Sequence, residues 1–144
     1  MTRRYAESTT VPVDRSRGEI SGILASHGVT RMGWMTDHGE DQLLFEIGGA
    51  NHRLTIHKPT PEELRTRDGG NYVYPHNVDW QAKVDQEWKR RWRANVLLLK
   101  AKLEFIDAGD STIERELLPF RVLEDGRTIE EAVLDGGRLL AAHS

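Results

Sequence analysis

Hydrophobic and polar residues alternate in three short segments of the first half of the chain. The alternation is clearest at 42–47, where Leu43, Phe45 and Ile47 occupy every second position. This pattern is typical of a strand with one covered face. Turn-forming sequences, DHGE and GGAN, separate the segments. We therefore predict an antiparallel sheet with strands at 31–36, 42–47 and 52–57.

Further along, hydrophobic residues recur at every third or fourth position, which places them on one face of an α-helix. The pattern predicts a long amphipathic helix over about 78–107 that ends at Gly109 and buries its apolar face. The residues of this face are Val84, Trp88, Trp92, Val96, Leu99, Leu103 and Ile106.

Capping pairs predict the shorter helices, because a Ser or Thr side chain and a Glu three residues later satisfy each other's free amides. The segment PFRVL predicts one further strand at 119–123. The elements together predict a single α+β domain over 1–144, with flexible ends at about 1–10 and 137–144. In this order an N-terminal helix precedes the sheet, and a small helix–strand–helix appendage follows the long helix. The predicted capping pairs are Ser16 with Glu19, Thr60 with Glu63, Ser111 with Glu114, and Thr128 with Glu131.

Composition narrows the class of protein. The chain has 144 residues, of which 38% are hydrophobic and 30% charged, as in a globular domain that is not embedded in a membrane. Its longest apolar run, 96–99, is far too short to span a bilayer. The absence of cysteine excludes disulfides, thiolate zinc sites and cysteine nucleophiles. We expect a cytoplasmic protein without a membrane partner.

The sequence KRRWR at 89–93 is the most prominent charged feature. Residues 83–102 carry seven Lys or Arg and two Asp or Glu, a local charge of +5 in a chain of net charge −3. On a helix Lys89, Arg93 and Lys100 lie along one line, and such a row can neutralise successive phosphates. Two alternatives remain: the cations flank a half-buried helix in solvent, or they pair with the acidic segment 103–135.

Aromatic side chains near this helix are candidates for base stacking. Tyr72 and Tyr74 lie in a predicted loop at 68–77, and Trp80 begins the long helix. Together with Arg90 and Arg93 they complete a predicted nucleic-acid surface, to which Arg53 on the open face of the sheet is added. Alternatively the aromatic residues fasten the loop to the core.

No catalytic signature is complete. The chain lacks G-x-S-x-G, a phosphate-binding G-x-x-x-x-G-K-[ST] loop and H-E-x-x-H. His57, His76 and Asp79 suggest a histidine–carboxylate site, but their spacing follows no metal-ligand rule. We therefore predict no metal, no cofactor and no enzymatic activity. Among enzyme hypotheses, His76 with Asp79 is the only pair from the loop to consider.

Two stretches, STTVPVDRSRGEISGILASHG near the start and RWRANVLLLKAKLEFIDAGDSTIERELLPFRVLEDGRTI near the end, carry a family likeness. They resemble a family of small proteins encoded by tailed bacteriophages and prophages, to which no catalytic role is assigned. The resemblance spans about 8–130 and implies a phage-encoded protein that acts in the host cytoplasm. The order of a three-stranded meander and a long basic helix is also similar to the core of phage single-strand annealing proteins.

These observations predict a non-enzymatic nucleic-acid-binding protein, with single-stranded DNA as its ligand in recombination or replication. The alternative is a protein-interaction module. Its partner is then a host or phage protein with an acidic surface, or a second copy of the chain in a homo-oligomer.

Overall fold

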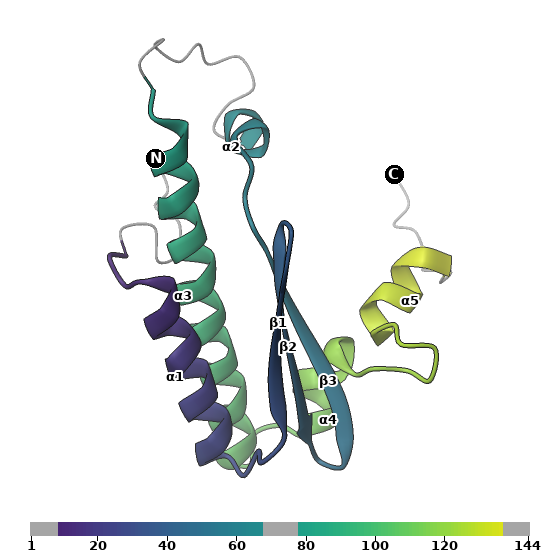
Figure 1. Cartoon of the computed structure of the whole chain (residues 1–144). Helices are drawn as coiled ribbons and strands as arrows, with labels where there is room; N and C mark the ends of the chain where they lie inside the picture. The colour runs from purple at the N-terminus through teal and green to yellow at the C-terminus, as the bar shows by residue number, and fades with distance from the viewer. Residues whose placement is uncertain (1–8, 68–77, 137–144) are drawn as a thin grey trace, which may run out of the picture.

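The computed structural model describes residues 9–67 and 78–136 of the chain. Three antiparallel strands form a sheet in the order β1-β2-β3. Helices α1 and α3 lie side by side against one face of this sheet, and α5 stands on the opposite side (Figure 1). The predicted α+β class is confirmed. The elements are α1 (Val13–Ser26), β1 (Met32–Asp37), β2 (Glu40–Ile47), β3 (Ala50–His57), α2 (Pro61–Arg67), α3 (Trp80–Asp107), α4 (Ile113–Leu117), the 3₁₀ helix η1 (Leu118–Phe120) and α5 (Ile129–Gly136).

The three predicted strands are confirmed, with β2 and β3 each starting two residues earlier than expected. In the register of the sheet, Phe45 of β2 pairs with Met32 on one side and with His52 on the other. The β2–β3 hairpin turns at Gly48 and Gly49, whose φ angles are 61° and 76°. Two successive positive φ angles belong to the turn that matches the twist of a hairpin, and glycine adopts them without strain.

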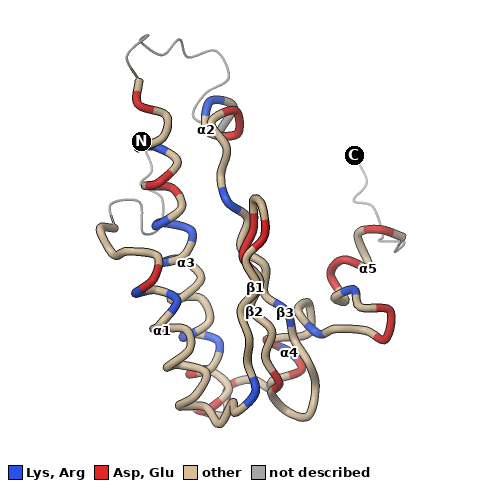
Figure 2. Tube along the Cα trace, in the orientation of Figure 1, with Lys and Arg blue, Asp and Glu red and all other residues tan. Residues whose placement is uncertain are grey.

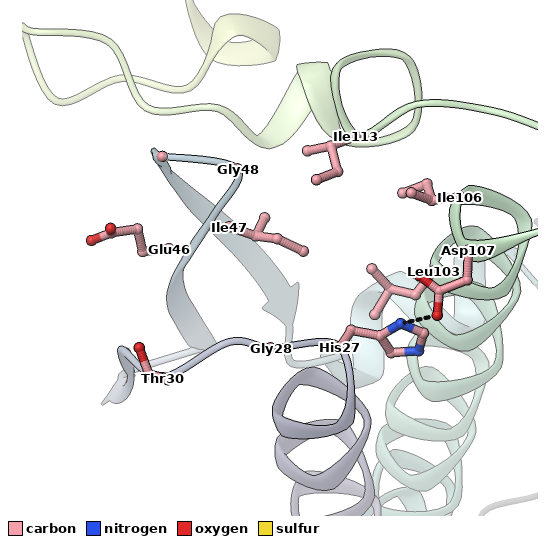
Figure 3. Close-up of a pocket in the computed structure, with 11 residues that line it drawn as sticks. His27, Gly28, Thr30, Glu46, Ile47, Gly48, Leu103, Ile106, Asp107 and Ile113 are labelled. Carbon is pink, nitrogen blue, oxygen red and sulfur yellow. Dashed lines mark ion pairs between the residues drawn. The ribbon is translucent and has the colours of Figure 1, made fainter. Parts of the chain in front are cut away.

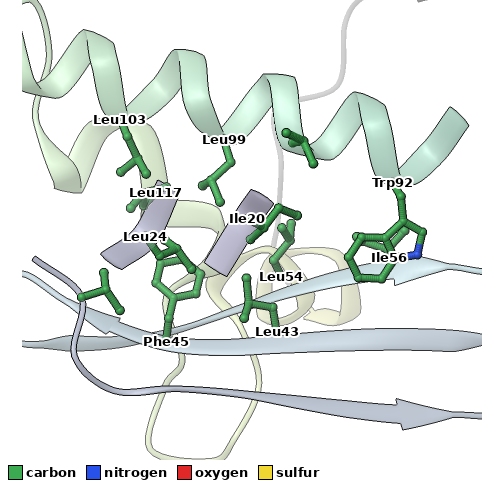
Figure 4. Close-up of a cluster of buried hydrophobic side chains, with 12 residues drawn as sticks. Ile20, Leu24, Leu43, Phe45, Leu54, Ile56, Trp92, Leu99, Leu103 and Leu117 are labelled. Atoms are coloured by element: carbon green, nitrogen blue, oxygen red, sulfur yellow. The ribbon is translucent and has the colours of Figure 1, made fainter. Parts of the chain in front are cut away.

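The hydrophobic core lies between the sheet and the helix pair (Figure 4). Trp92 is completely buried, and its ring centre lies 5.2 Å from that of Trp34 and 5.9 Å from that of Trp88. The prediction that Trp88 and Trp92 pack in the core is therefore confirmed. The buried residues around them include Ile20 and Leu24 of α1, Leu43 and Phe45 of β2, Leu54 and Ile56 of β3, and Val96, Leu99 and Leu103 of α3.

The predicted cap at Ser16 is wrong. Helix α1 begins at Val13, because Pro12 has extended backbone angles and its carbonyl accepts hydrogen bonds from the amides of Arg15 and Ser16. Ser16 lies one turn inside the helix and is fully buried on the same face as Ile20. Residues spaced by four share a helix face, so Ser16 belongs to the core face and not to the helix start.

Two predicted capping pairs are confirmed. At the start of α2, the amide of Glu63 donates to Thr60 Oγ1 at 3.2 Å, and the amide of Thr60 donates to the Glu63 carboxylate at 3.3 Å. At the start of α5, Thr128 and Glu131 make the same reciprocal pair at 3.1 and 3.4 Å. Both helices therefore begin where local side-chain chemistry predicts.

The predicted cap of α4 is shifted by one residue. Thr112, and not Ser111, accepts the amide of Arg115 at 3.1 Å. The hydroxyl of Ser111 instead donates to the carboxylate of Glu116 at 2.9 Å. Neighbouring Ser and Thr residues compete for the cap position, and the sequence alone does not distinguish them.

The predicted strand at 119–123 is wrong. Pro119 lies in the first turn of η1, where its missing N–H is tolerated, and only isolated bridges follow, from Arg121 to His52 and from Val122 to Thr128. The amide of Val122 still donates to the carbonyl of Asn51 at 2.9 Å. This short contact covers one end of the outer edge of β3.

Candidate interaction surfaces

The arginines at 90 and 91 are paired with carboxylates. Nε of Arg90 lies 2.6 Å from Oε1 of Glu87, a residue that is only 4% exposed. Arg91 donates to Glu63 of α2 at 2.7 Å and to the carbonyl of His57 at 2.8 Å. The expectation that these two cations face solvent unpaired is wrong, because a buried carboxylate such as Glu87 needs opposite charges beside it.

Arg93 and Arg53 are paired as well, and each connects two elements. Nη1 of Arg93 lies 2.6 Å from Glu19 and thereby ties α3 to α1. The guanidinium of Arg53 is paired with Glu131 of α5 and donates to the carbonyl of Gly126 at 2.8 Å. The carboxylates paired with the three arginines of α3 all lie outside 103–135, so the basic and acidic segments do not simply neutralise each other. Whether these arginines bind nucleic acid stays a prediction.

The pairing changes the acidity of two of the carboxylates. The hydrogen bond from Arg91 holds the pKa of Glu63 below its ordinary value, even though partial burial acts in the opposite direction. Burial alone would raise the pKa of Glu131, but the hydrogen bonds from Arg53 and Thr128 outweigh it and lower the pKa. Both carboxylates are thus held in the charged form that the arginines need.

A further buried ion pair was not anticipated from the sequence. Arg17 of α1 places its guanidinium 2.8 Å from the buried carboxylate of Asp41 on β2. The same guanidinium lies 5.0 Å from the ring centre of Trp92 and 5.4 Å from that of Trp34. The aromatic faces and the carboxylate together stabilise this cation inside the fold. Arg17 and Asp41 are distant in the sequence and meet only because α1 packs over β2.

Lys89 and Lys100 differ from the arginines. Among the described residues, no carboxylate lies within ion-pair distance of either lysine. Figure 2 shows that Lys and Arg residues recur along α3 with acidic residues at the same level in the neighbouring elements. Lys102 has a distant partner in Glu116, at 3.8 Å. The unpaired positive charge of α3 is therefore smaller than its sequence suggests.

The aromatic part of the predicted nucleic-acid surface is only partly visible. Tyr72 and Tyr74 lie outside the described residues. Trp80 begins α3, and the guanidinium of Arg65 on α2 lies 4.6 Å from its ring centre. A cation above the ring covers one of the faces that a base would use for stacking.

The suggested histidine–carboxylate site is not assembled among the described residues. His57 pairs with Glu40 at 3.3 Å, and Asp79 caps α3 by accepting the amide of Ala82 at 3.0 Å. His76 lies outside the described residues. Within the described ranges, no group of three metal-ligating side chains comes together.

A cavity of about 350 Å³ lies at the end of the molecule where α1 and α3 finish (Figure 3). On one side, Nδ1 of His27 lies 2.7 Å from the carboxylate of Asp107, and Leu103 and Ile106 line the wall near them. A histidine next to an aspartate can act as a base, but catalysis also needs a nucleophile and a group that stabilises developing charge. Among the described residues that line this cavity, Thr30 alone carries a hydroxyl. We interpret the pair as a link between the two helix ends.

A second cavity, of about 430 Å³, lies between the outer face of the sheet and α5. Acidic side chains predominate along it, with Glu40 from the sheet and Glu130 and Glu131 from α5. Leu134, which is 71% exposed, forms part of its rim. The cavity is open and partly polar, and its best-fixed charges, Arg53 and Glu131, neutralise each other.

The solvent-facing side of α3 carries a second apolar stripe after Arg93. Leu98 and Phe105 are each 49% exposed, and the small residues Ala94 and Ala101 continue the same line. These positions are separated by four, three and four residues, the spacing of a surface that packs against another helix. The sequence contains this signal, but the stronger core stripe at Val96, Leu99 and Leu103 obscures it. We call Ala94, Leu98, Ala101 and Phe105 the outer stripe.

A shallow hollow adjoins the outer stripe. Leu98, Asn95 and Lys102 line it from α3, and Phe120 of η1 closes its other side. Its lining is almost entirely apolar, but its volume of about 10 Å³ is too small for a side chain of another molecule.

Comparison with known proteins adds no relative: no family model, curated protein or solved structure matches the chain. Among the described helices, none has the length and apolarity needed to cross a membrane.

Proposed function

We propose that the chain is a non-enzymatic protein-interaction module that binds an acidic protein partner along the outer stripe of α3. The observation that carries the proposal is the half-exposed pair Leu98 and Phe105 on the solvent side of a helix whose other side is already buried. Apolar side chains in such a row are typical of a surface that receives a partner helix.

Charge indicates the kind of partner. No Asp or Glu occurs between Glu87 and Glu104 of α3, whereas six Lys or Arg do. Lys89 and Lys100 lie on another face of the same helix and have no carboxylate within ion-pair distance among the described residues, so an acidic partner gains attraction during the encounter. The resemblance to tailed-phage proteins makes a host or phage protein the expected partner.

The test is affinity capture from a lysate of the bacterial host with three forms of the full chain. We expect a protein that is retained by the wild type and lost by the variant Leu98→Asp/Phe105→Asp. The matched control is Leu134→Asp, which places a charge on α5, on the opposite side of the sheet. A protein retained equally by all three forms, or lost by the control as well, contradicts the proposal.

Nucleic-acid binding is the second candidate, favoured by the row of Lys89, Arg93 and Lys100 on one side of α3. Within this row Arg93 is paired, so the free charges are those of the two lysines. The double variant Lys89→Glu/Lys100→Glu should therefore abolish nucleic-acid binding. Fluorescence anisotropy with a labelled single-stranded oligonucleotide at about 50 mM and about 200 mM salt measures both the affinity and its salt dependence. Binding that is unaffected by salt and by the double variant excludes this candidate.

A further inference from the structure

The two edge strands of the sheet, β3 and β1, differ in whether another segment contacts their outer backbone groups. The outer edge of β3 is covered at one end, where Val122 donates its amide to the carbonyl of Asn51. Strand β1 forms the other edge, and β2 is its only neighbour in the sheet. An uncovered edge strand offers a row of backbone donors and acceptors to another strand.

The register shows which backbone groups of β1 are available. The amide of Glu46 donates to the carbonyl of Arg31 at 3.0 Å, so Arg31 and every second residue after it direct their backbone groups toward β2. The alternate residues Met32, Trp34 and Thr36 therefore direct theirs outward. Among the described residues, no backbone hydrogen bond reaches these outward groups.

Strand β1 has few of the features that prevent edge pairing, and its one charged residue, Asp37, lies at its end. It has the sequence MGWMTD, without proline or lysine, and pairs with β2 residue by residue without a bulge. Met35 on its outer face is 52% exposed. Natural edge strands usually carry one of these protective features, so their absence indicates that this edge has a partner.

Side chains along β1 are complementary to those of a second, antiparallel copy. If the two-fold axis passes beside Trp34, Arg31 lies opposite Asp37 of the second copy, and the same pair recurs at the other end. The side chain of Arg31 is 82% exposed, with a 3.4 Å contact to Glu46. In the same register, bulky Met35 lies opposite Gly33 of the second copy. A shift by two residues loses both pairings, so charge and size select one register.

Helix α1 leaves space for this arrangement. Ser21 of α1 accepts a hydrogen bond from Trp34 Nε1 at 3.4 Å, so this side of the helix lies over β1. The neighbouring positions on that side are Gly18, Gly22 and Ala25, all of them exposed. A methyl group added at either glycine would meet no atom within 4 Å. Small side chains there allow the α1 helices of two copies to approach each other above a joined sheet.

We propose that the chain forms a two-fold homodimer in which β1 pairs with β1 of a second copy, making one continuous six-stranded antiparallel sheet. The inference depends on β1 and α1 and is independent of the outer stripe of α3. The dimer therefore presents two copies of that stripe.

Analytical ultracentrifugation of the full chain tests the dimer. We expect a species of twice the 16.4 kDa protomer mass. Thr36→Pro removes an outward amide without breaking a hydrogen bond to β2, and should raise the dimer dissociation constant at least about tenfold. Thr36→Val keeps the amide and is the matched control. A monomer at about 100 μM wild type, or a Thr36→Pro dimer as tight as the control, overturns the proposal.

Mixed disulfides test the register, because the chain has no cysteine of its own. Gly33→Cys and Met35→Cys proteins should form a covalent dimer under mild oxidation only when they are mixed, since these positions face each other across the proposed interface. Equal cross-linking of either variant alone contradicts this register. Loss of the dimer in Leu98→Asp/Phe105→Asp but not in Thr36→Pro assigns the interface to α3 and overturns the proposal.

Discussion

The two halves of α3 differ in how their partly exposed side chains contact the rest of the protein. In the first half, from Trp80 to Arg93, charged side chains of α3 are joined to other elements: Arg91 to α2 and Arg93 to α1. In the second half, from Ala94 to Asp107, Leu98 and Phe105 remain half exposed, and the ion pairs are those of Lys102 with Glu116 and of Asp107 with His27. The first half therefore carries the arginine pairs that join α3 to α2 and α1, whereas the second half combines core residues such as Val96 and Leu99 with the half-exposed outer stripe.

This difference reverses the functional interpretation of the sequence. The composition of the KRRWR cluster suggests a ligand-binding surface, yet all three of its arginines are paired with carboxylates of the protein. The segment ANVLLLKAKLEF, which has no comparable cluster of charges, carries both a core stripe and the outer stripe. Charge density in a sequence does not indicate free charge when the carboxylates that neutralise it lie in other elements.

The largest expected contrast is between a buried and an exposed apolar residue of α3. Trp92→Ala should lower the free energy of unfolding by about 3–5 kcal/mol, because it leaves a cavity under Arg17 and Trp34. Leu98→Ala should change it by no more than about 0.5 kcal/mol, as is usual for surface positions. Urea denaturation followed by circular dichroism measures both. A comparable loss for Leu98→Ala would show that the outer stripe is covered within the folded chain.

A smaller effect is expected for the buried carboxylate of the first half. Glu87→Gln should destabilise the fold by about 1–3 kcal/mol, because Arg90 and Arg91 each lose a charged partner and Arg91 keeps only Glu63. The matched change in the second half is Glu104→Gln, at an exposed position, with an expected effect within about 0.5 kcal/mol. The same denaturation experiment compares them. Equal values would remove the distinction between the two halves.

Removing a paired and an unpaired cation of α3 should likewise have different effects on stability. Arg93→Ala should cost about 1 kcal/mol through the lost contact with Glu19, which is partly exposed to solvent. Lys100→Ala should be nearly neutral for stability. Thermal unfolding of both variants at low and high salt measures this difference, which should narrow as salt screens the Arg93 pair. A more destabilising Lys100→Ala would indicate a structural partner for that lysine.

The smallest expected effect is on the stability of the fold at acid pH. Because the hydrogen bond from Arg91 lowers the pKa of Glu63 below its ordinary 4.5, the unfolded chain takes up a proton more readily than the folded one. The stabilisation is therefore complete above pH 4.5 and is lost as the pH falls through the lower pKa of the folded state. Urea midpoints measured down to acid pH should decline more steeply for the wild type than for Glu63→Gln. Parallel declines would show that this pair contributes nothing.

Local signals predicted most of the secondary structure. The alternation at 42–47, the long period of α3 and the pairs Thr60–Glu63 and Thr128–Glu131 depend on residues close in sequence, and the structure confirms them. The failure at Ser16 has a cause outside the local sequence pattern. Ser16 has the right neighbour for a cap, but Pro12 starts the helix earlier and the core takes Ser16 into its buried face.

Interaction surfaces were predicted less well than elements, because they depend on which elements meet. Nothing near Arg93 in the sequence indicates that Glu19 will pair with it, since the two residues are joined only when α1 packs on α3. The open edge of β1 likewise follows from strand order, which no single segment contains. The outer stripe was present in the sequence and could have been found by looking for a second period on the same helix.

The sequence by itself determined where helices and strands form, because hydrophobic period and capping act between residues a few positions apart. It also determined the composition of α3, with four Lys and Arg residues clustered at 89–93. Only the tertiary structure decided which of those charges remain free and which sheet edge stays open, because ion pairs and strand neighbours join residues that are distant along the chain.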